Sequence, residues 1–254
     1  KKILSTKKPL IIIGESALEM KNGKYIFEEL KNFLFKSGLI TKDWNALNIL
    51  PQNASTVGSI DLKLMSYNKE NNFIFFDLLK KKEFEILYLL NSDNLEINKK
   101  DEFIIYQGSH GDRGAEIADV ILPSAAFTEQ EGLYCNLEGR VQNCRKASYP
   151  PGEALENWKI FNLISKKITL KDLYKNNENL RDEVLEMLPN FSKLDLLPKV
   201  TINNREKTSS NFVDEKINIK KIDYYYTNAI SRSSKIMGQC REIKSNELKN
   251  GINN

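Results

Sequence analysis

One glycine-rich stretch holds the residue types in this sequence that could bind or transform a ligand. The run Gly108–Gly114 reads GSHGDRG; it follows an apolar segment and precedes a short helical pattern. Backbone N–H groups in such a turn, with a helix N-terminus behind them, can bind phosphate. The spacing matches neither the dinucleotide fingerprint nor the P-loop, and glycines also let a chain turn tightly. We therefore interpret the stretch as a structural turn.

His110, the only histidine, lies in this run beside Asp112 and Arg113. A histidine next to a carboxylate could act as a general base. However, the sequence has no G-x-S-x-G nucleophile elbow and no second histidine that could complete a metal pair. We interpret His110 as a loop residue that makes ordinary hydrogen bonds.

The three cysteines, Cys135, Cys144 and Cys240, are well separated and form no C-x-x-C pair. This usage fits free thiols in a reducing compartment rather than a disulfide framework. Three thiols cannot ligate an iron–sulphur cluster in the usual four-thiolate manner. With His110 they could numerically form a zinc site, but zinc sites normally show close ligand pairs. We expect no metal ligand here.

Two further groups of residues allow more than one interpretation. Carboxylates near an arginine surround two glycines, at Glu129, Glu131, Glu138, Arg140, Gly132 and Gly139. Paired carboxylates can do acid–base work, but a structural ion pair is the commoner arrangement, and we favour it. The consecutive tyrosines 224–226 suit either a protein interface or the packing of the chain's own core.

Composition excludes some classes of function. The 38 Lys and Arg against 34 Asp and Glu leave a formal charge of +4, and the basic residues are spread along the chain. Nucleic-acid binding would require a focused basic face, so we expect no nucleic-acid partner. No stretch reaches the roughly 18 apolar residues of a membrane span. The chain begins at Lys1 rather than Met, so the lack of a targeting segment is uninformative.

Apolar runs alternate with helical patterns in the first part of the chain. We expect strands at 10–13, 47–50, 86–90, 103–106 and 120–122, and helices at 26–36, 73–80 and 114–118. Strands that are apolar throughout are usually covered on both faces, so we predict an α/β fold with a mainly parallel sheet. Ligands of such sheets bind beyond the carboxyl ends of strands, here after Ile13, Tyr106 and Leu122.

The character of the sequence changes after Trp158. Helical spacing predicts helices at 158–168 and 179–188, the latter ended by Pro189. Residues 199–223 are polar, which favours a long surface loop or a partly ordered linker, and the aromatic segment 224–240 is expected to dock on another part of the structure. We predict an α/β domain over residues 1–168 and a helical and irregular C-terminal extension over 169–254.

Several separated blocks resemble one family in the correct order. Tyr106–Pro123 reads YQGSHGDRGAEIADVILP, and AFTE, NLEGRVQ, PPG and WKI follow at residues 126, 136, 150 and 158. This order is similar to the molybdopterin oxidoreductase family and, more narrowly, to the large iron–sulphur subunits of respiratory complex I. The segments Pro9–Glu19, Trp44–Asp61 and Asp223–Cys240 agree.

The resemblance implies a molybdopterin-oxidoreductase-like α/β domain that acts as a structural part of the peripheral arm of complex I. It implies that the arm's iron–sulphur clusters lie in an N-terminal region or a separate chain, so we expect no cofactor in this chain. We assign no catalytic, cofactor-binding or metal-ligating residue. Eight residues of the matching blocks are expected to determine the fold: Gly108, Gly111, Gly114, Asp119, Pro123, Glu138, Gly139 and Arg140.

The expected partners are the other peripheral-arm subunits, which include the cluster-bearing part. The expected location is the matrix side of the mitochondrial inner membrane, or the cytoplasmic side of a bacterial inner membrane. Two alternatives stay open: a fragment of an active molybdopterin-dependent oxidoreductase, and a free-standing nucleotide-binding module of the doubly wound type.

Overall fold

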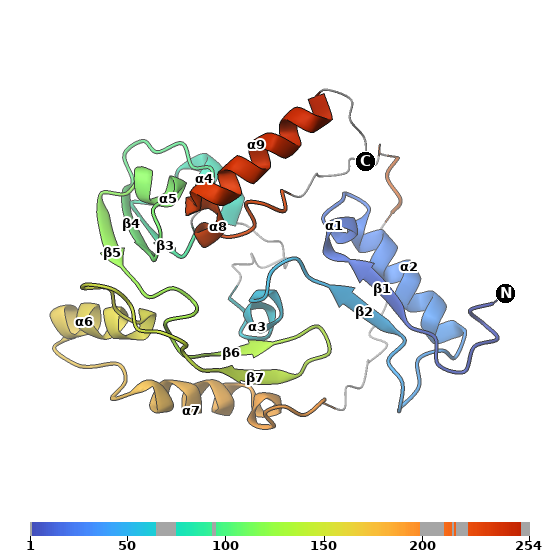
Figure 1. Ribbon diagram of the computed structural model, residues 1–254. Coiled ribbons are helices and arrows are strands. Elements are labelled where there is room, and N and C mark those ends of the chain that lie inside the picture. Colours follow the sequence, from blue (N-terminus) through green and yellow to red (C-terminus); the bar gives the residue numbers. More distant parts are fainter. Residues whose placement is uncertain are drawn as a thin grey trace. The chain divides into compact units, whose positions relative to one another are not determined.

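The computed structural model describes residues 2–64, 75–92, 95–198, 211–214, 216 and 223–249. The chain divides into two compact units (Figure 1). The first comprises Lys1–Leu64, Leu133–Asn143 and Glu183–Lys220, and the second comprises Met65–Gly132, Cys144–Asp182 and Lys221–Asn254. Both units draw on segments that are distant in sequence. The boundary predicted at residue 168 stays a prediction.

The first unit contains a parallel pair of strands, β1 (Ile11–Gly14) and β2 (Leu47–Leu50), with Ile11 opposite Leu47. The same unit contains three helices, α1 (Glu15–Leu18), α2 (Gly23–Lys36) and α3 (Thr56–Asp61). The apolar stripe of α2, at helical spacing, packs into a core centred on Leu34 and Leu47.

A second core in this unit joins segments from three parts of the chain. Strands β6 (Gly132–Cys135) and β7 (Val141–Cys144) form a two-stranded sheet, and Gly139 in the connection has φ +82°. Cys135 and Val141 pack with Phe191, which lies in the 3-10 helix η1 (Pro189–Ser192) after α7 (Asn177–Met187). The left-handed φ explains the glycine at 139.

The second unit is built on a three-stranded parallel sheet in the order β3 (Ile86–Leu90), β4 (Phe103–Gly108), β5 (Val120–Pro123) (Figure 1). One face buries Leu89, Ile104 and Tyr106 against residues of α4 (Phe75–Lys81) and α5 (Arg113–Glu116). Because side chains alternate along a strand, the neighbouring positions Tyr88, Ile105 and Gln107 belong to the opposite face.

Helix α6 (Asn157–Thr169) lies on that opposite face. The ring of Phe161 stacks on Tyr88 at 5.6 Å between centroids, and the Asn157 side chain contacts Gln107. Just before the helix, the buried carboxylate of Glu156 accepts hydrogen bonds from Trp158 Nε1 and Lys159 Nζ. Burial opposes the charge of Glu156, but these hydrogen bonds outweigh burial and hold the pKa of this carboxyl below its ordinary value.

The C-terminal strap, residues 223–241, contains α8 (Ala229–Ser233) and the start of α9 (Lys235–Lys249). A capping box between Asn228 and Ser231 begins α8. Arg241 donates to the Asp223 carboxylate at 2.5 Å and lies over the Tyr226 ring, 4.7 Å from its centroid. The strap is therefore held in a compact turn by its own side chains.

The predicted α/β fold with parallel strands is confirmed, and β1 to β5 each lie within two residues of a predicted strand. The structure adds α1, α3, β6, β7, α8 and α9, for which we made no prediction. The start of the predicted 73–80 helix and most of the loop predicted at 199–223 lie outside the described residues.

Asp119, which precedes β5, anchors the middle strand. Its Oδ2 accepts from the Ile104 amide at 2.7 Å, and its Oδ1 accepts from Lys99 Nζ at 2.5 Å. The amide of Ile104 and then Lys99 hold the pKa of the Asp119 carboxyl below its ordinary value. The ionised carboxylate therefore contributes stability above the unfolded-state pKa of about 3.9, and the contribution is lost as pH falls through the lower folded-state pKa.

We predict that Asp119→Asn lowers the free energy of unfolding at neutral pH, because it removes the charge that Lys99 and the Ile104 amide stabilise. The difference from wild type should shrink as pH falls below about 4. Urea unfolding between about pH 7 and about pH 3 measures it. Asp101→Asn, at an exposed position, is the matched control. An equal, pH-independent loss in both variants would contradict the assignment.

Candidate functional site

The carboxyl edge of the β3–β4–β5 sheet is the candidate site, because ligands of parallel α/β sheets bind there. The loop Gly108–Gly114 leaves β4 at this edge and leads into α5. Asp112 is the N-cap residue of α5, and its carboxylate accepts from the Arg113 amide at 2.8 Å. The structure therefore brings the glycine-rich run to the place that the strand pattern predicted.

The ring of Tyr106 fills the space inside this loop. Tyr106 is 1% exposed, and its hydroxyl donates to the His110 carbonyl oxygen at 2.7 Å. A Cβ atom added at Gly108 would overlap this ring, and one at Gly114 would lie 2.8 Å from the Ser92 carbonyl oxygen and 2.9 Å from Tyr106 Cδ2. Gly108 and Gly114 are therefore required for close packing.

Gly111 differs from its two neighbours. A Cβ atom at Gly111 would meet nothing within 4 Å. None of the three glycines of the loop has a left-handed φ. We expected these glycines to turn the chain. The structure gives Gly108 and Gly114 a more specific role, which is to let the ring of Tyr106 come close to the backbone.

His110 makes only local contacts through its ring among the described residues. Its Nδ1 lies 2.9 Å from the hydroxyl oxygen of Ser109, its exposed neighbour. The Asp112 carboxylate instead bonds to the Arg113 amide and to Arg232. An activated serine nucleophile needs a histidine base that is itself oriented by a third group, usually a carboxylate. Since the Asp112 carboxylate bonds elsewhere, Ser109 and His110 do not form such an arrangement.

An ion pair joins the strap to this loop. Arg232 in α8 donates from Nε to the Asp112 carboxylate, and each side chain is only 18% exposed. The same guanidinium donates to the Tyr226 carbonyl oxygen at 3.4 Å. Of the consecutive tyrosines, Tyr226 thus packs within the strap, whereas Tyr224 is exposed.

A buried polar chain fixes the other side of the edge. Gln107 is fully buried; its Oε1 accepts from the Tyr88 hydroxyl, and its Nε2 donates to Asn157 Oδ1 at 2.8 Å. The backbone N–H of Asn157 donates to Gln130 Oε1, and the side-chain Nε2 of Gln130 donates to the Ala125 carbonyl oxygen. Each amide group is used within the protein, which is the usual state of a structural polar network.

The cysteines do not form a ligand set. Cys135 is buried, Cys144 is partly buried and Cys240 is exposed. Burial raises the pKa of the Cys135 thiol, and the nearby Asp61 carboxylate raises it further, so this thiol stays protonated and unreactive at neutral pH. In the described part of the chain no three His, Cys, Asp or Glu side chains come together as metal ligands do.

The expected ion pair around Arg140 is not among the contacts of the described residues. Arg140 Nη1 instead donates to the Asp195 carbonyl oxygen at 2.7 Å, while Glu138 contacts Asn136. Glu129 accepts from the Ala126 amide, and Glu131 contacts Asn177. These side chains link neighbouring loops, which is a structural arrangement. Their partners among the described residues are main-chain and side-chain amide groups rather than each other.

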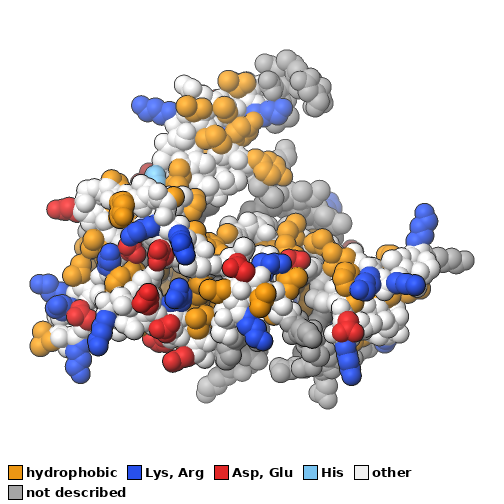
Figure 2. Space-filling view, turned by 60° about the horizontal axis from the view of Figure 1, so that its bottom comes forward, with side chains coloured by type: hydrophobic (Ala, Val, Ile, Leu, Met, Phe, Trp, Pro, Cys, Tyr) orange, Lys and Arg blue, Asp and Glu red, His pale blue; other side chains and the backbone are white. Residues whose placement is uncertain are grey.

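Surface charge on the visible face is mixed. Figure 2 shows Lys and Arg side chains interspersed with Asp and Glu side chains rather than gathered in one basic patch. Among the described residues, no helix combines the length and the apolar composition needed to cross a membrane.

Comparison with known families gives two matches along the chain. Residues 1–167 match the model of the molybdopterin oxidoreductase family. The chain belongs to that family. Residues 193–240 match a second model, which describes the C-terminal region of one subunit of NADH-ubiquinone oxidoreductase. The strap thus lies largely in the second match, whereas the loop that it contacts lies in the first.

Individual relatives extend over nearly the whole chain. The NADH-ubiquinone oxidoreductase 75 kDa subunit of Reclinomonas americana is 39% identical over 96% of this chain and 35% of its own length. The mitochondrial 78 kDa subunit of Neurospora crassa is 35% identical over 96% and 33%. An NADH-quinone oxidoreductase subunit of Rickettsia bellii is 36% identical over 98% and 35%. The chain spans about a third of the length of these relatives.

The residues at this edge do not suit the anionic pterin cofactor that the family name implies. An anion requires available N–H donors or cations. Arg232 pairs with Asp112, Arg113 pairs with Glu96, and the ring of Tyr106 fills the loop. The buried hydroxyl of Ser124 has no hydrogen-bond partner among the described residues, but one neutral hydroxyl is too little to hold such a group.

We predict that Gly114→Ala destabilises the protein by about 1–3 kcal/mol, the usual cost of overpacking, because its methyl group would press on Ser92 and Tyr106. Gly111→Ala, three residues earlier, should change stability by less than about 0.5 kcal/mol. Thermal and urea unfolding of the two variants provide the comparison. Equal losses would show that the loop needs glycine for its turn rather than for the approach of Tyr106.

A double-mutant cycle with Asp112→Asn and Arg232→Gln tests the ion pair, since Asn keeps the capping acceptor of α5. We expect a coupling energy of about 0.5–3 kcal/mol, with faster hydrogen exchange in residues 108–114 and in the strap. The matched cycle is Glu96→Gln with Arg113→Gln, a pair in the same region whose side chains are 81% and 55% exposed. Its coupling should be near zero, and equal couplings would refute the special role of Arg232.

Proposed function

We propose that this chain is the C-terminal part of the large subunit of an NADH:quinone oxidoreductase and that it acts as a scaffold in the peripheral arm. In this role it supports electron transfer from NADH to the quinone without holding a cluster or a pterin cofactor of its own. Catalysis belongs to the whole complex, and this chain would hold the cluster-bearing region in place.

The observation that carries the proposal is the similarity over nearly the entire chain to subunits named for this enzyme, including the separate C-terminal match. A loop filled by the Tyr106 ring and joined to the strap by the Arg232–Asp112 pair supports a structural role. A ligand site at this edge would need open donors, whereas a scaffold benefits from groups that are satisfied internally.

Partners and location follow from the same proposal. The chain would contact other peripheral-arm subunits, among them the cluster-bearing part of the large subunit. It would lie on the matrix side of the mitochondrial inner membrane, or on the cytoplasmic side of a bacterial inner membrane, because relatives of both origins match it. It would attach through proteins rather than through lipid.

A pull-down from gently solubilised native membranes tests the proposal. We expect mass spectrometry to find the flavin-bearing and cluster-bearing subunits of the complex with the tagged chain, in constant ratio across a sizing column. The same sample is assayed for molybdenum and for fluorescent pterin oxidation products, which should be absent. Recovery of the chain alone, or with molybdenum and pterin, would reject the scaffold and favour an active molybdopterin-dependent oxidoreductase.

A further inference from the structure

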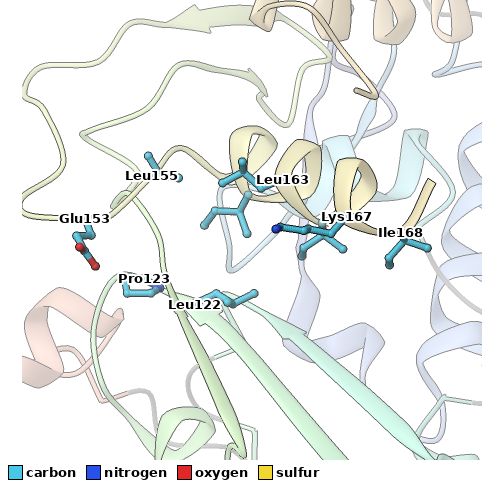
Figure 3. Close-up of a pocket in the computed structure, with 9 residues that line it drawn as sticks. Leu122, Pro123, Glu153, Leu155, Leu163, Lys167 and Ile168 are labelled. Atoms are coloured by element: carbon cyan, nitrogen blue, oxygen red, sulfur yellow. The ribbon is translucent and has the colours of Figure 1, made fainter. Parts of the chain in front are cut away.

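An open apolar groove runs between the edge strand β5 and helix α6 within the second unit. It has a volume of about 350 Å³ and is lined chiefly by aliphatic side chains. Figure 3 shows Leu122 and Pro123 of β5 on one side and Leu163 and Ile168 of α6 on the other. Glu153 and Lys167 are the only charged residues of the lining. The groove therefore favours apolar side chains over a polar ligand.

The apolar surface continues across the same face of the sheet. Ile86 and Phe103 are paired at the starts of β3 and β4, and Ile105 is paired with Val120 at the start of β5. Paired positions project to the same face, and Leu122 shares the face of Val120. Ile86 is 63% exposed and Phe103 is 45% exposed. As far as the described residues go, apolar side chains at the amino ends of these strands therefore remain exposed.

Coverage of the two faces is unequal. The opposite face packs against residues of α4 and α5. On the face that bears the groove, α6 contacts β3 and β4 beyond their first residues. The ring of Phe161 stacks on Tyr88 of β3, and the side chain of Asn157 bonds to Gln107 of β4. Ile168, near the end of α6, is 76% exposed. Parallel sheets are normally buried on both faces by polypeptide of the same fold, and exposed apolar patches of this kind mark docking sites.

We propose that this groove and the adjoining sheet face are the docking surface for the rest of the large subunit, meaning the polypeptide that relatives carry outside the matched third of their length. This inference rests on the proposed function. Relatives about three times longer than the match supply enough chain for the missing cover, and the two-sided burial of a parallel sheet requires that cover. The docking element presents aliphatic side chains to Leu163 and Ile168.

Site-specific photocrosslinking in cells that produce the complex tests the inference. A photoreactive phenylalanine analogue replaces Leu163, and mass spectrometry identifies the crosslinked peptides. We expect peptides from the large-subunit region outside the matched third. The same analogue at Ile243 in α9, which is 60% exposed and outside the groove, is the matched control and should not give those peptides.

The outcomes are distinct. Crosslinks from Leu163 to a second copy, to another subunit or to this chain's own residues would overturn the inference, as would no crosslink at all. If the pull-down finds the complex and Leu163 crosslinks elsewhere, the scaffold stands and only the docking surface is wrong. If the pull-down finds no complex, the proposed function itself fails.

Charge substitution gives a second measurement. Leu163→Glu with Ile168→Glu should cause loss of the remaining large-subunit polypeptide from the purified complex by at least about tenfold, which corresponds to 1.4 kcal/mol. Ile243→Glu should leave its recovery unchanged. Unfolding curves that match wild type would show that the double variant is folded. Full retention by the folded double variant would refute the docking surface.

Discussion

The end of strand β4 is the constraint on which the second unit depends. Tyr106 and Gln107 are adjacent, and both are buried, but they belong to opposite faces of the sheet. The ring of Tyr106 sets the shape of the loop that follows, since Gly108 and Gly114 both lie against it. The amide of Gln107 joins Tyr88 to the first residue of α6. Two consecutive residues thus place the loop on one side and the helix on the other.

This arrangement shows how the protein's own side chains occupy a sheet edge of the kind at which parallel α/β folds bind ligands. The strap matches a family model specific to one enzyme's subunit, and it returns across 120 residues to pair Arg232 with Asp112. That pair is largely shielded from water, so it is screened less than a surface pair. It also engages the guanidinium of Arg232 with a carboxylate, which makes it less available to an anion. The Arg113 guanidinium pairs with Glu96 in the same way, so both arginines of this edge are engaged with carboxylates of the protein.

The sequence predicted the parallel sheet well because its signal is local. Runs such as Ile86–Leu90 are apolar throughout and only five residues long, a length that favours a strand over a helix. The β6–β7 sheet was missed because Gly132–Cys135 and Val141–Cys144 do not alternate cleanly, and their core partner Phe191 lies about fifty residues away. The glycine at 139, with its left-handed φ, was the available signal for the turn between them.

The loop shows the same limit for the candidate site. Sequence spacing placed Gly108–Gly114 at the carboxyl edge and favoured a structural role, but it could not separate Gly111 from Gly114. The difference depends on where the Tyr106 ring and the Ser92 carbonyl lie in space. It likewise could not pair Asp112 with Arg232, because oppositely charged residues were available at many closer positions.

Helix α6 links the buried part of the second unit to its open surface. Its first residue, Asn157, belongs to the polar network, and Ile160 is buried, whereas Leu163 and Ile168 are exposed. Ile160, Leu163 and Ile168 line the same groove, so only part of this one apolar face is covered by packing within the described residues. Because the polar network fixes the position of the helix, the exposed part of this face cannot turn inward. That exposed part must either remain in water, at a cost of roughly 25 cal/mol per Å², or be covered by other polypeptide, as the proposed docking of the rest of the large subunit would do.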